Sequence, residues 1–178
     1  ALQKIRDPAV APKLAFLLRD LNEKVQVAAV ETTGLLQNKE ALPMLREVLE
    51  GKRSAKVRRT ALVAMAMIPD EASRDLFTRH FTDKDDAMRA GAAEGLGRLR
   101  NPGDRPLVEK AFDEERKMSP RLSLAFALVL LGRQEITEHS PLQYLINTLN
   151  SKAYRGVAQA FLVELTRDAA VRGSAQAA

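Results

Sequence analysis

A twelve-residue pattern recurs five times along the chain of 178 residues, at a nearly constant spacing. Apolar or small residues occupy its first, fifth, ninth and twelfth positions in most copies, and these positions share one face of an α-helix. A unit of this length cannot bury its own apolar face, so the repeat predicts a row of helical units that cover one another. The copies begin at Val25, Val57, Met88, Pro120 and Tyr154, which places successive starts 32, 31, 32 and 34 residues apart.

A second amphipathic helix is predicted before each copy, over residues 10–18, 41–49, 72–81, 105–112 and 141–149. Turns such as Asn101-Pro102 separate the repeats, because proline disfavours helical geometry in the residue before it. The sequence thus predicts an all-α fold, a right-handed α–α superhelix of about five two-helix repeats in a single domain. The repeats are expected at about residues 8–38, 39–69, 70–102, 103–135 and 136–171.

Both ends of the chain depart from the full repeat. Residues 1–7 match the second half of an inner helix, so we expect a partial helix there. The same match predicts that this chain is the C-terminal part of a longer array. Residues 172–178 offer little to bury and are expected to fray.

The composition fits thin helical layers rather than one large core. Aromatic residues make up 4% of the chain and tryptophan is absent. The absence of cysteine excludes disulfides, thiol catalysis and cysteine-ligated metals. It leaves the compartment unknown, with the cytoplasm slightly favoured and the periplasm open. The longest run without a polar residue, 124–132, is too short to cross a bilayer, so no membrane insertion is expected.

The third copy of the repeat carries a family resemblance most fully. Its sequence has an aspartate-rich turn, an apolar–arginine pair, two alanines, and a Leu-Gly pair before a final apolar residue; these are Asp83, Asp85, Asp86, Met88, Arg89, Ala92, Ala93, Leu96, Gly97 and Leu99. The pattern resembles the HEAT-like repeat of the phycobilisome-lyase type, and looser resemblance covers nearly the whole chain. It implies a solenoid with outer helices on the convex side and inner helices lining a concave groove. Ankyrin and tetratricopeptide repeats have similar periods, but their signature residues are missing here.

Arginine recurs at the second position of the inner helices, and the resemblance implies a structural role for it. In the family, an acidic residue six positions earlier pairs with this arginine and forms a ladder between repeats. Here Asp83 stands six residues before Arg89, and Glu115 stands six residues before Arg121. We therefore expect these four residues to form a structural ladder. In repeats two and five the acidic residue is missing, and there a ladder and an anion site stay equally open.

The family geometry also places a set of side chains in the concave groove, where a partner would bind. The fourth inner helix is apolar nearly all round, and an apolar stripe on its groove side would be typical of a partner contact. Strong curvature or the C-terminal segment could equally cover this stripe. The predicted groove residues are Arg59, Val63, Met67, Glu94 and Arg98, together with Leu122, Phe126 and Leu130 of the stripe.

The charge of the chain weakly favours acidic partners, including nucleic acid, since the net charge is +5 and the pI is near 9.7. The densest basic cluster runs from Lys52 to Arg59. A solvated turn accounts for this cluster more simply than a nucleic-acid site. Acidic residues such as Glu31 and Glu94 interrupt its extension along the groove, and aromatic residues for base stacking are scarce.

Patterns for catalysis or metal binding are weak. His80 and His139 stand alone, without metal-ligand spacing. Gly95-Leu96-Gly97 follows no predicted strand, so it is not a nucleotide-binding fingerprint. We expect no metal, no cofactor and no enzymatic activity.

The sequence therefore favours a non-catalytic scaffold that binds a protein partner in the concave groove. Nucleic-acid binding through the basic groove residues is the alternative, and the missing tryptophan counts against it. A bilin-lyase-like role is a second alternative, implied by the resemblance alone. The identity of the partner and the oligomeric state stay open.

Overall fold

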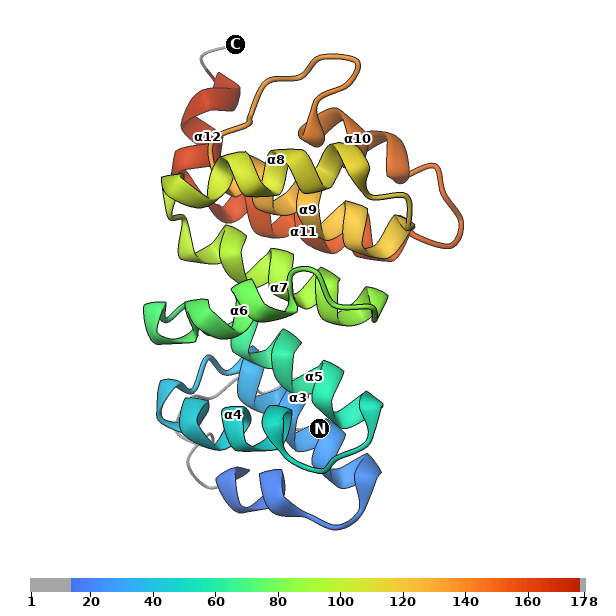
Figure 1. The fold of residues 1–178 in the computed structure, drawn as a ribbon. Coiled ribbons are helices and arrows are strands. Elements are labelled where there is room, and N and C mark those ends of the chain that lie inside the picture. Colours follow the sequence, from blue (N-terminus) through green and yellow to red (C-terminus); the bar gives the residue numbers. More distant parts are fainter. Residues whose placement is uncertain (1–13, 177–178) are drawn as a thin grey trace.

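The structure, a computed structural model, describes residues 14–176, and the side chains of residues 14–172. Every element in this part of the chain is a helix, and the helices alternate between an inner and an outer layer (Figure 1). The prediction of an all-α repeat solenoid is confirmed. The inner helices are α3 (Glu23–Leu35), α5 (Ala55–Ala66), α7 (Asp86–Leu99), α9 (Met118–Leu130) and α11 (Arg155–Arg167). The outer helices are α4 (Leu42–Glu50), α6 (Arg74–His80), α8 (Arg105–Glu114) and α10 (Pro141–Thr148), preceded by the 3₁₀-helix Ala15–Arg19.

Capping side chains fix where three of the inner helices begin. Asn22 Oδ1 accepts hydrogen bonds from the backbone N–H groups of Lys24 and Val25, at 3.0 and 3.4 Å. Ser54 and Asp85 cap α5 and α7 in the same way. These side chains satisfy donors that the first helical turn leaves without partners, so the short polar turns set the start of each helix.

Small residues bring neighbouring inner helices almost into backbone contact. A Cβ atom built on Gly97 of α7 would lie 2.6 Å from the Cα atom of Ala127 on α9. A Cβ atom on Gly34 of α3 would lie 2.8 Å from the Cα atom of Ala64 on α5. Consecutive outer helices do not approach each other as closely. Because the inner layer is more tightly spaced than the outer layer, the stack bends toward the inner helices.

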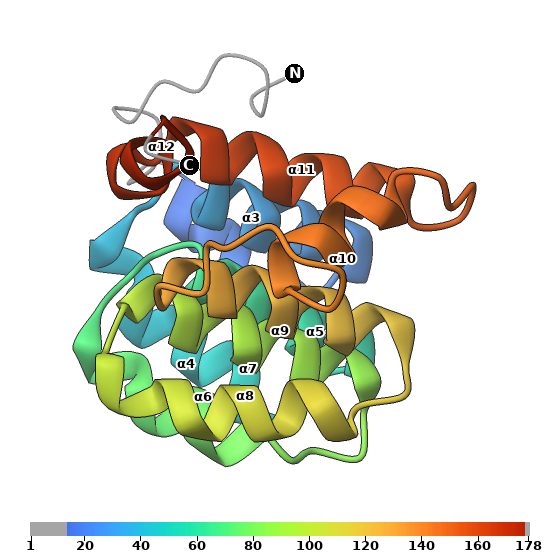
Figure 2. The ribbon, with the colours of Figure 1, turned by 90° about the horizontal axis from the view of Figure 1, so that it is seen from above.

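The bend brings the last inner helix across the concave face. Figure 2 shows α11 on the inner-helix side of the stack, and α11 and the C-terminal end of α3 line one hollow, although they belong to the last and first repeats. The linker before α10, residues 131–140, contains no helix, whereas a 3₁₀ turn leads into each of α4, α6 and α8. The fifth repeat therefore ends the stack and also covers part of its concave side.

The first part of the predicted tail, residues 172–176, belongs to α12 (Ala169–Gln176), and its fraying stays a prediction. Asp168 Oδ1 accepts hydrogen bonds from the backbone N–H groups of Ala170 and Val171, at 3.0 and 3.3 Å, and so caps the start of this helix. Val171 is buried, which anchors the first turn of α12. The predicted partial helix at residues 1–7 and the last two residues of the tail lie outside the described residues.

Gly97→Ala tests the close approach of α7 and α9. The added methyl group would meet backbone atoms that cannot rotate away, so we expect the free energy of unfolding to fall by about 1–3 kcal/mol. Gly156→Ala in α11 is the control, because nothing lies within 4 Å of its added Cβ and alanine favours a helix over glycine. Chemical denaturation measures both variants, and equal stabilities would contradict the close approach.

Candidate partner-binding groove

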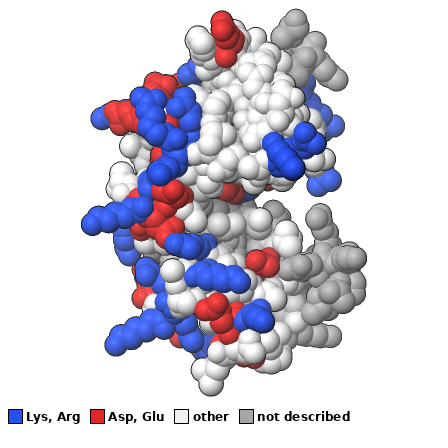
Figure 3. All heavy atoms as spheres, turned by 90° about the vertical axis from the view of Figure 1, so that its right-hand side faces the viewer, with Lys and Arg blue, Asp and Glu red and all other residues white. Residues whose placement is uncertain are grey.

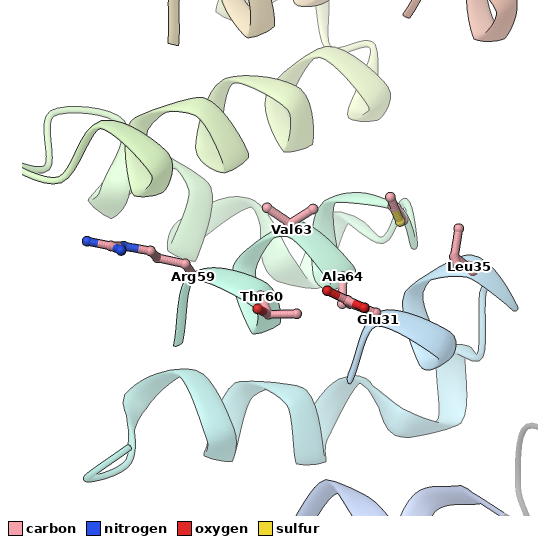
Figure 4. A pocket seen from close by; sticks show the side chains of 7 residues that line it. Glu31, Leu35, Arg59, Thr60, Val63 and Ala64 are labelled. Atoms are coloured by element: carbon pink, nitrogen blue, oxygen red, sulfur yellow. The ribbon is translucent and has the colours of Figure 1, made fainter. Parts of the chain in front are cut away.

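The concave face holds a hollow of about 450 Å³ between α3 and α5 (Figure 4). Helix α5 forms most of its lining, and α3 contributes the wall beside it. The lining is mainly apolar, with one acidic and one basic side chain. The lining residues are Glu31, Leu35, Arg59, Thr60, Val63, Ala64 and Met67.

A second hollow of about 460 Å³ adjoins the first, since Leu35 and Met67 line both. Helix α11 supplies its far wall through Ala160, Val163 and Arg167, among other residues. We call the two hollows together the open groove. Helices α3 and α5 flank the first hollow, and the second hollow lies between the C-terminal end of α3 and helix α11.

Four of the predicted groove residues, Arg59, Val63, Met67 and Arg98, line the open groove. Sequence reasoning missed Leu35 of α3 and Val163 of α11, whose large apolar side chains are 39% and 42% exposed. Leu35 occupies the same repeat position as Met67, so extending the groove positions to the first repeat would have found it. Val163 carried no such signal, because its place depends on how α11 crosses the concave face.

The prediction that Leu122, Phe126 and Leu130 line an open groove is wrong. Their side chains are 0%, 0% and 7% exposed. Helix α11 lies over this part of the concave face, and the ring of Phe161 stacks on that of Phe126 with centroids 4.5 Å apart. Of the two possibilities that the sequence left open for the stripe, the C-terminal segment covers it. The stripe is part of the core.

Glu94 and Arg98, which were predicted to line the groove, form an ion-pair network that holds α11, and Arg98 also lines the second hollow. Arg98 donates from Nε and Nη2 to the two carboxylate oxygens of Glu164 on α11, at 2.8 and 2.9 Å. Its Nη1 donates to Glu94 at 3.1 Å, and Ser123 Oγ donates to Glu94 at 3.0 Å. Burial raises the pKa of Glu94 above its ordinary value, although Arg98 and Ser123 oppose the shift. These contacts use most of the hydrogen-bonding capacity of both residues for the fold.

The predicted ladder connects repeats, but through other acceptors than predicted. Arg89 Nη1 donates to the backbone carbonyl of Asp83 at 2.8 Å, and Arg121 Nη1 donates to that of Glu115 at 2.9 Å. The expected pairing with the acidic side chain six residues earlier is therefore wrong. The carboxylate of Glu115 instead accepts a hydrogen bond from Arg89 Nε of the preceding repeat, at 2.9 Å.

A carbonyl acceptor also accounts for the arginines that lack the acidic residue. Arg155 Nε donates to the backbone carbonyl of Leu149, six residues earlier, at 2.8 Å. Arg58 Nε donates to the carbonyl of Leu49 at 2.9 Å. Any residue type provides this acceptor, so the arginine column serves the turn between the two helices in repeats two and five as well.

A second series of ion pairs links the outer layer, and sequence reasoning missed it. In each pair an arginine near an outer helix reaches a carboxylate of the next repeat, 28 to 30 residues later. The signal was available as opposite charges at the repeat period. The pairs are Arg19–Glu47, Arg46–Asp75 and Arg74–Asp104.

The predicted basic cluster, residues 52–59, spans the turn before α5, on the side of the molecule shown in Figure 3. Basic and acidic side chains are intermixed on this side. Arg59 donates to Asp85 at 2.8 Å, while Arg98 and Arg100 pair with carboxylates of α11 and of the residue that follows it. The positive charge forms no continuous track here, so the nucleic-acid alternative gains no support and stays a prediction.

Among the described side chains, no group of three or more His, Cys, Asp and Glu residues is placed to hold a metal ion. No helix in the described part of the chain is long and apolar enough to span a membrane. The expected lack of cofactor and catalysis stays a prediction.

The alternating helical layers define a repeat solenoid, and comparison with known families identifies which one. A family model of HEAT repeats matches residues 10–89 and again residues 45–129. These matches span more than half of the chain, which therefore belongs to the HEAT repeat family. Such repeats are typically non-catalytic and commonly mediate protein interactions. A search of curated proteins found no match, and the phycobilisome-lyase subtype stays a prediction.

Phe161→Ala tests how α11 is held on the concave face. Removing the ring that stacks on Phe126 leaves a cavity, so we expect the docking of α11 to weaken by about 3–5 kcal/mol. Hydrogen exchange should become faster in α11 while α3 and α5 keep their protection, because repeats are stabilised mainly by their neighbours. Val157→Ala on the same helix removes an exposed side chain and should leave exchange unchanged. Uniformly faster exchange in Phe161→Ala would contradict separate docking of α11.

Glu115→Gln tests the ladder between the third and fourth repeats. Burial raises the pKa of Glu115, but the hydrogen bond from Arg89 and those from the backbone outweigh it, so the net shift is downward. The ionised carboxylate therefore stabilises the fold above its unfolded-state pKa of about 4.3, and this stability is lost as the pH falls through the lower folded-state pKa. At pH 7 we expect the variant to lose about 1–2 kcal/mol of stability.

The difference between the parent and Glu115→Gln should shrink below pH 4, as followed by urea denaturation across a pH series. Asp113→Asn, at an exposed position two residues earlier in the last turn of α8, should stay within about 0.5 kcal/mol of the parent throughout. A loss in Glu115→Gln that is constant with pH would show that the charge of the carboxylate is not what links the repeats.

Proposed function

We propose that this protein is a non-catalytic scaffold that binds a protein partner in the open groove. One observation carries the proposal: the groove holds large apolar side chains at its surface, whereas the neighbouring apolar stripe is covered by α11. Leu35 and Val163 both line the second hollow and are 39% and 42% exposed. A concave apolar surface that stays exposed usually marks a binding site.

The frame of the groove suits this role because its walls are held in place before any partner arrives. Close packing fixes α3 against α5, and the contacts of Arg98 and Phe161 fix α11. A preformed groove loses little conformational entropy on binding, which leaves more of the contact free energy for affinity.

The size of the groove indicates a contact of moderate strength. Each hollow accommodates one or two apolar side chains, and burial of two such side chains would contribute about 3–6 kcal/mol before the entropic cost of association. This supports a reversible interaction with a short segment of the partner.

A photo-crosslinking amino acid at position 35 tests the proposal, with the same group at position 107 as the matched control. Leu35 and Leu107 are 39% and 42% exposed, but Leu107 lies on the outer helix α8. Irradiation in an extract of the source cells should give a discrete protein adduct from position 35 that position 107 does not give. Adding Met67→Glu, which places a charge in the groove, should abolish the adduct. Identical adducts from both positions, or none from position 35, would refute the proposal.

A further inference from the structure

The molecule contains one example of what its concave face accepts, namely its own helix α11. Phe161 packs on the apolar stripe of α9, and Glu164, three residues later on the same helical face, forms two hydrogen bonds with Arg98 at 2.8 and 2.9 Å. An apolar side chain and a nearby carboxylate on one helix are thus complementary to the apolar stripe of α9 and to Arg98 of α7.

The open groove continues this surface into the first two repeats. Val63 and Met67 stand four residues apart on α5, at the same repeat positions as Phe126 and Leu130 on α9. The exposed face from Arg59 to Met67 covers about 12 Å of helix axis, which equals about two helical turns. A second helix that lies beside α11 could place apolar residues at i, i+4 and i+7 along this length.

Basic side chains stand at both ends of the groove. Lys56 lies one helical turn before Thr60 on α5, just outside the lining of the first hollow, and Arg167 lines the second hollow at the end of α11. Both are exposed, and neither forms an ion pair with another residue in the described part of the chain. Arg59 between them is already paired with Asp85. Carboxylates at the two ends of a bound segment would be attracted and lysines there would be repelled, whereas Glu31 in the first hollow would repel a carboxylate placed beside it.

The polar lining argues for a helix rather than an extended segment. An extended chain needs partners for its backbone N–H and C=O groups, whereas a helix satisfies them internally. The uncharged polar side chains that line the groove are Thr60 and Gln37, and Gln37 Nε2 already donates to the carbonyl of Met67 at 3.2 Å. The groove thus offers few hydrogen bonds to an extended backbone.

Building on the proposed function, we infer that the partner contributes an acidic amphipathic helix, which lies on α5 between α3 and α11. Its apolar face contacts Met67 and Val163, and its carboxylates face Lys56 and Arg167. This inference specifies the chemistry of the partner segment, which the proposed function leaves open.

Two synthetic 18-residue helical peptides serve as probes, with the same leucine face and with either glutamate or lysine on the polar face. Fluorescence anisotropy measures their binding to the whole chain at low and high salt. We expect the glutamate peptide to bind at least about tenfold more tightly at low salt, and this preference to shrink at high salt. Arg167→Glu should reduce the preference, whereas Lys110→Glu on the outer helix α8 should not.

Val163→Glu and Val157→Glu form a matched pair that locates the peptide. Both valines lie on α11 and are 42% and 44% exposed, but only Val163 lines the groove. The glutamate peptide should lose at least about tenfold in affinity with Val163→Glu and little with Val157→Glu. Circular dichroism checks that both variants keep the helical content of the parent.

The possible failures separate the inference from the proposed function. Equal binding of both peptides, lost with Val163→Glu, would overturn the acidic partner while leaving the groove as a binding site. No binding, or binding that ignores Val163→Glu, would overturn the helical occupant. Crosslinking from position 35 judges the scaffold function independently of either outcome.

Discussion

The close approach of the inner helices is the constraint on which the rest of the structure depends. Gly97 against Ala127 and Gly34 against Ala64 allow backbones to approach where any larger residue would hold them apart. The outer helices have no such contacts, so the stack bends toward its inner layer. The bend carries α11 over the concave face, and only then do residues from the first and last repeats line one hollow. Side chains of one hydrogen or one methyl group thus determine where the open groove forms.

Most of the fold could be predicted from the sequence because the same apolar pattern recurs in each repeat, so each copy supports the interpretation of the others. The positions of α4, α8 and α10 follow from apolar spacing, and the groove lining at Val63 and Met67 follows from repeat two alone. The ladder was only partly predictable. Sequence shows which side chains recur, but the acceptor of Arg121 is a backbone carbonyl, which every residue provides and no pattern can mark.

What the sequence could not determine is which part of the concave face the chain covers itself. Local pattern makes the stripe around Phe126 look like a partner site, and the chemistry is right, but the partner is α11 of the same chain. The complementary signs were present: Glu164 stands at the groove position of the last repeat, opposite in charge to Arg98, 66 residues earlier. Recognising them needs the curvature, which arises from contacts summed over several repeats.

Because α11 is both a resident of the concave face and a wall of the open groove, its docking and the binding of a partner must be coupled. A partner that contacts Val163 and Arg167 binds only while α11 is in place, so it stabilises the docked helix by its own binding free energy. By the same linkage, any change that weakens the hydrogen bonds between Arg98 and Glu164 also lowers the affinity for a partner, even where it makes no contact with that partner. Burial raises the pKa of Glu94, the other carboxylate of Arg98, so the hold on α11 includes a group whose ionisation is already opposed in the folded state. The ion-pair network under α11 is therefore coupled in energetic terms to the proposed binding site, and its members Arg98 and Glu164 also line the second hollow.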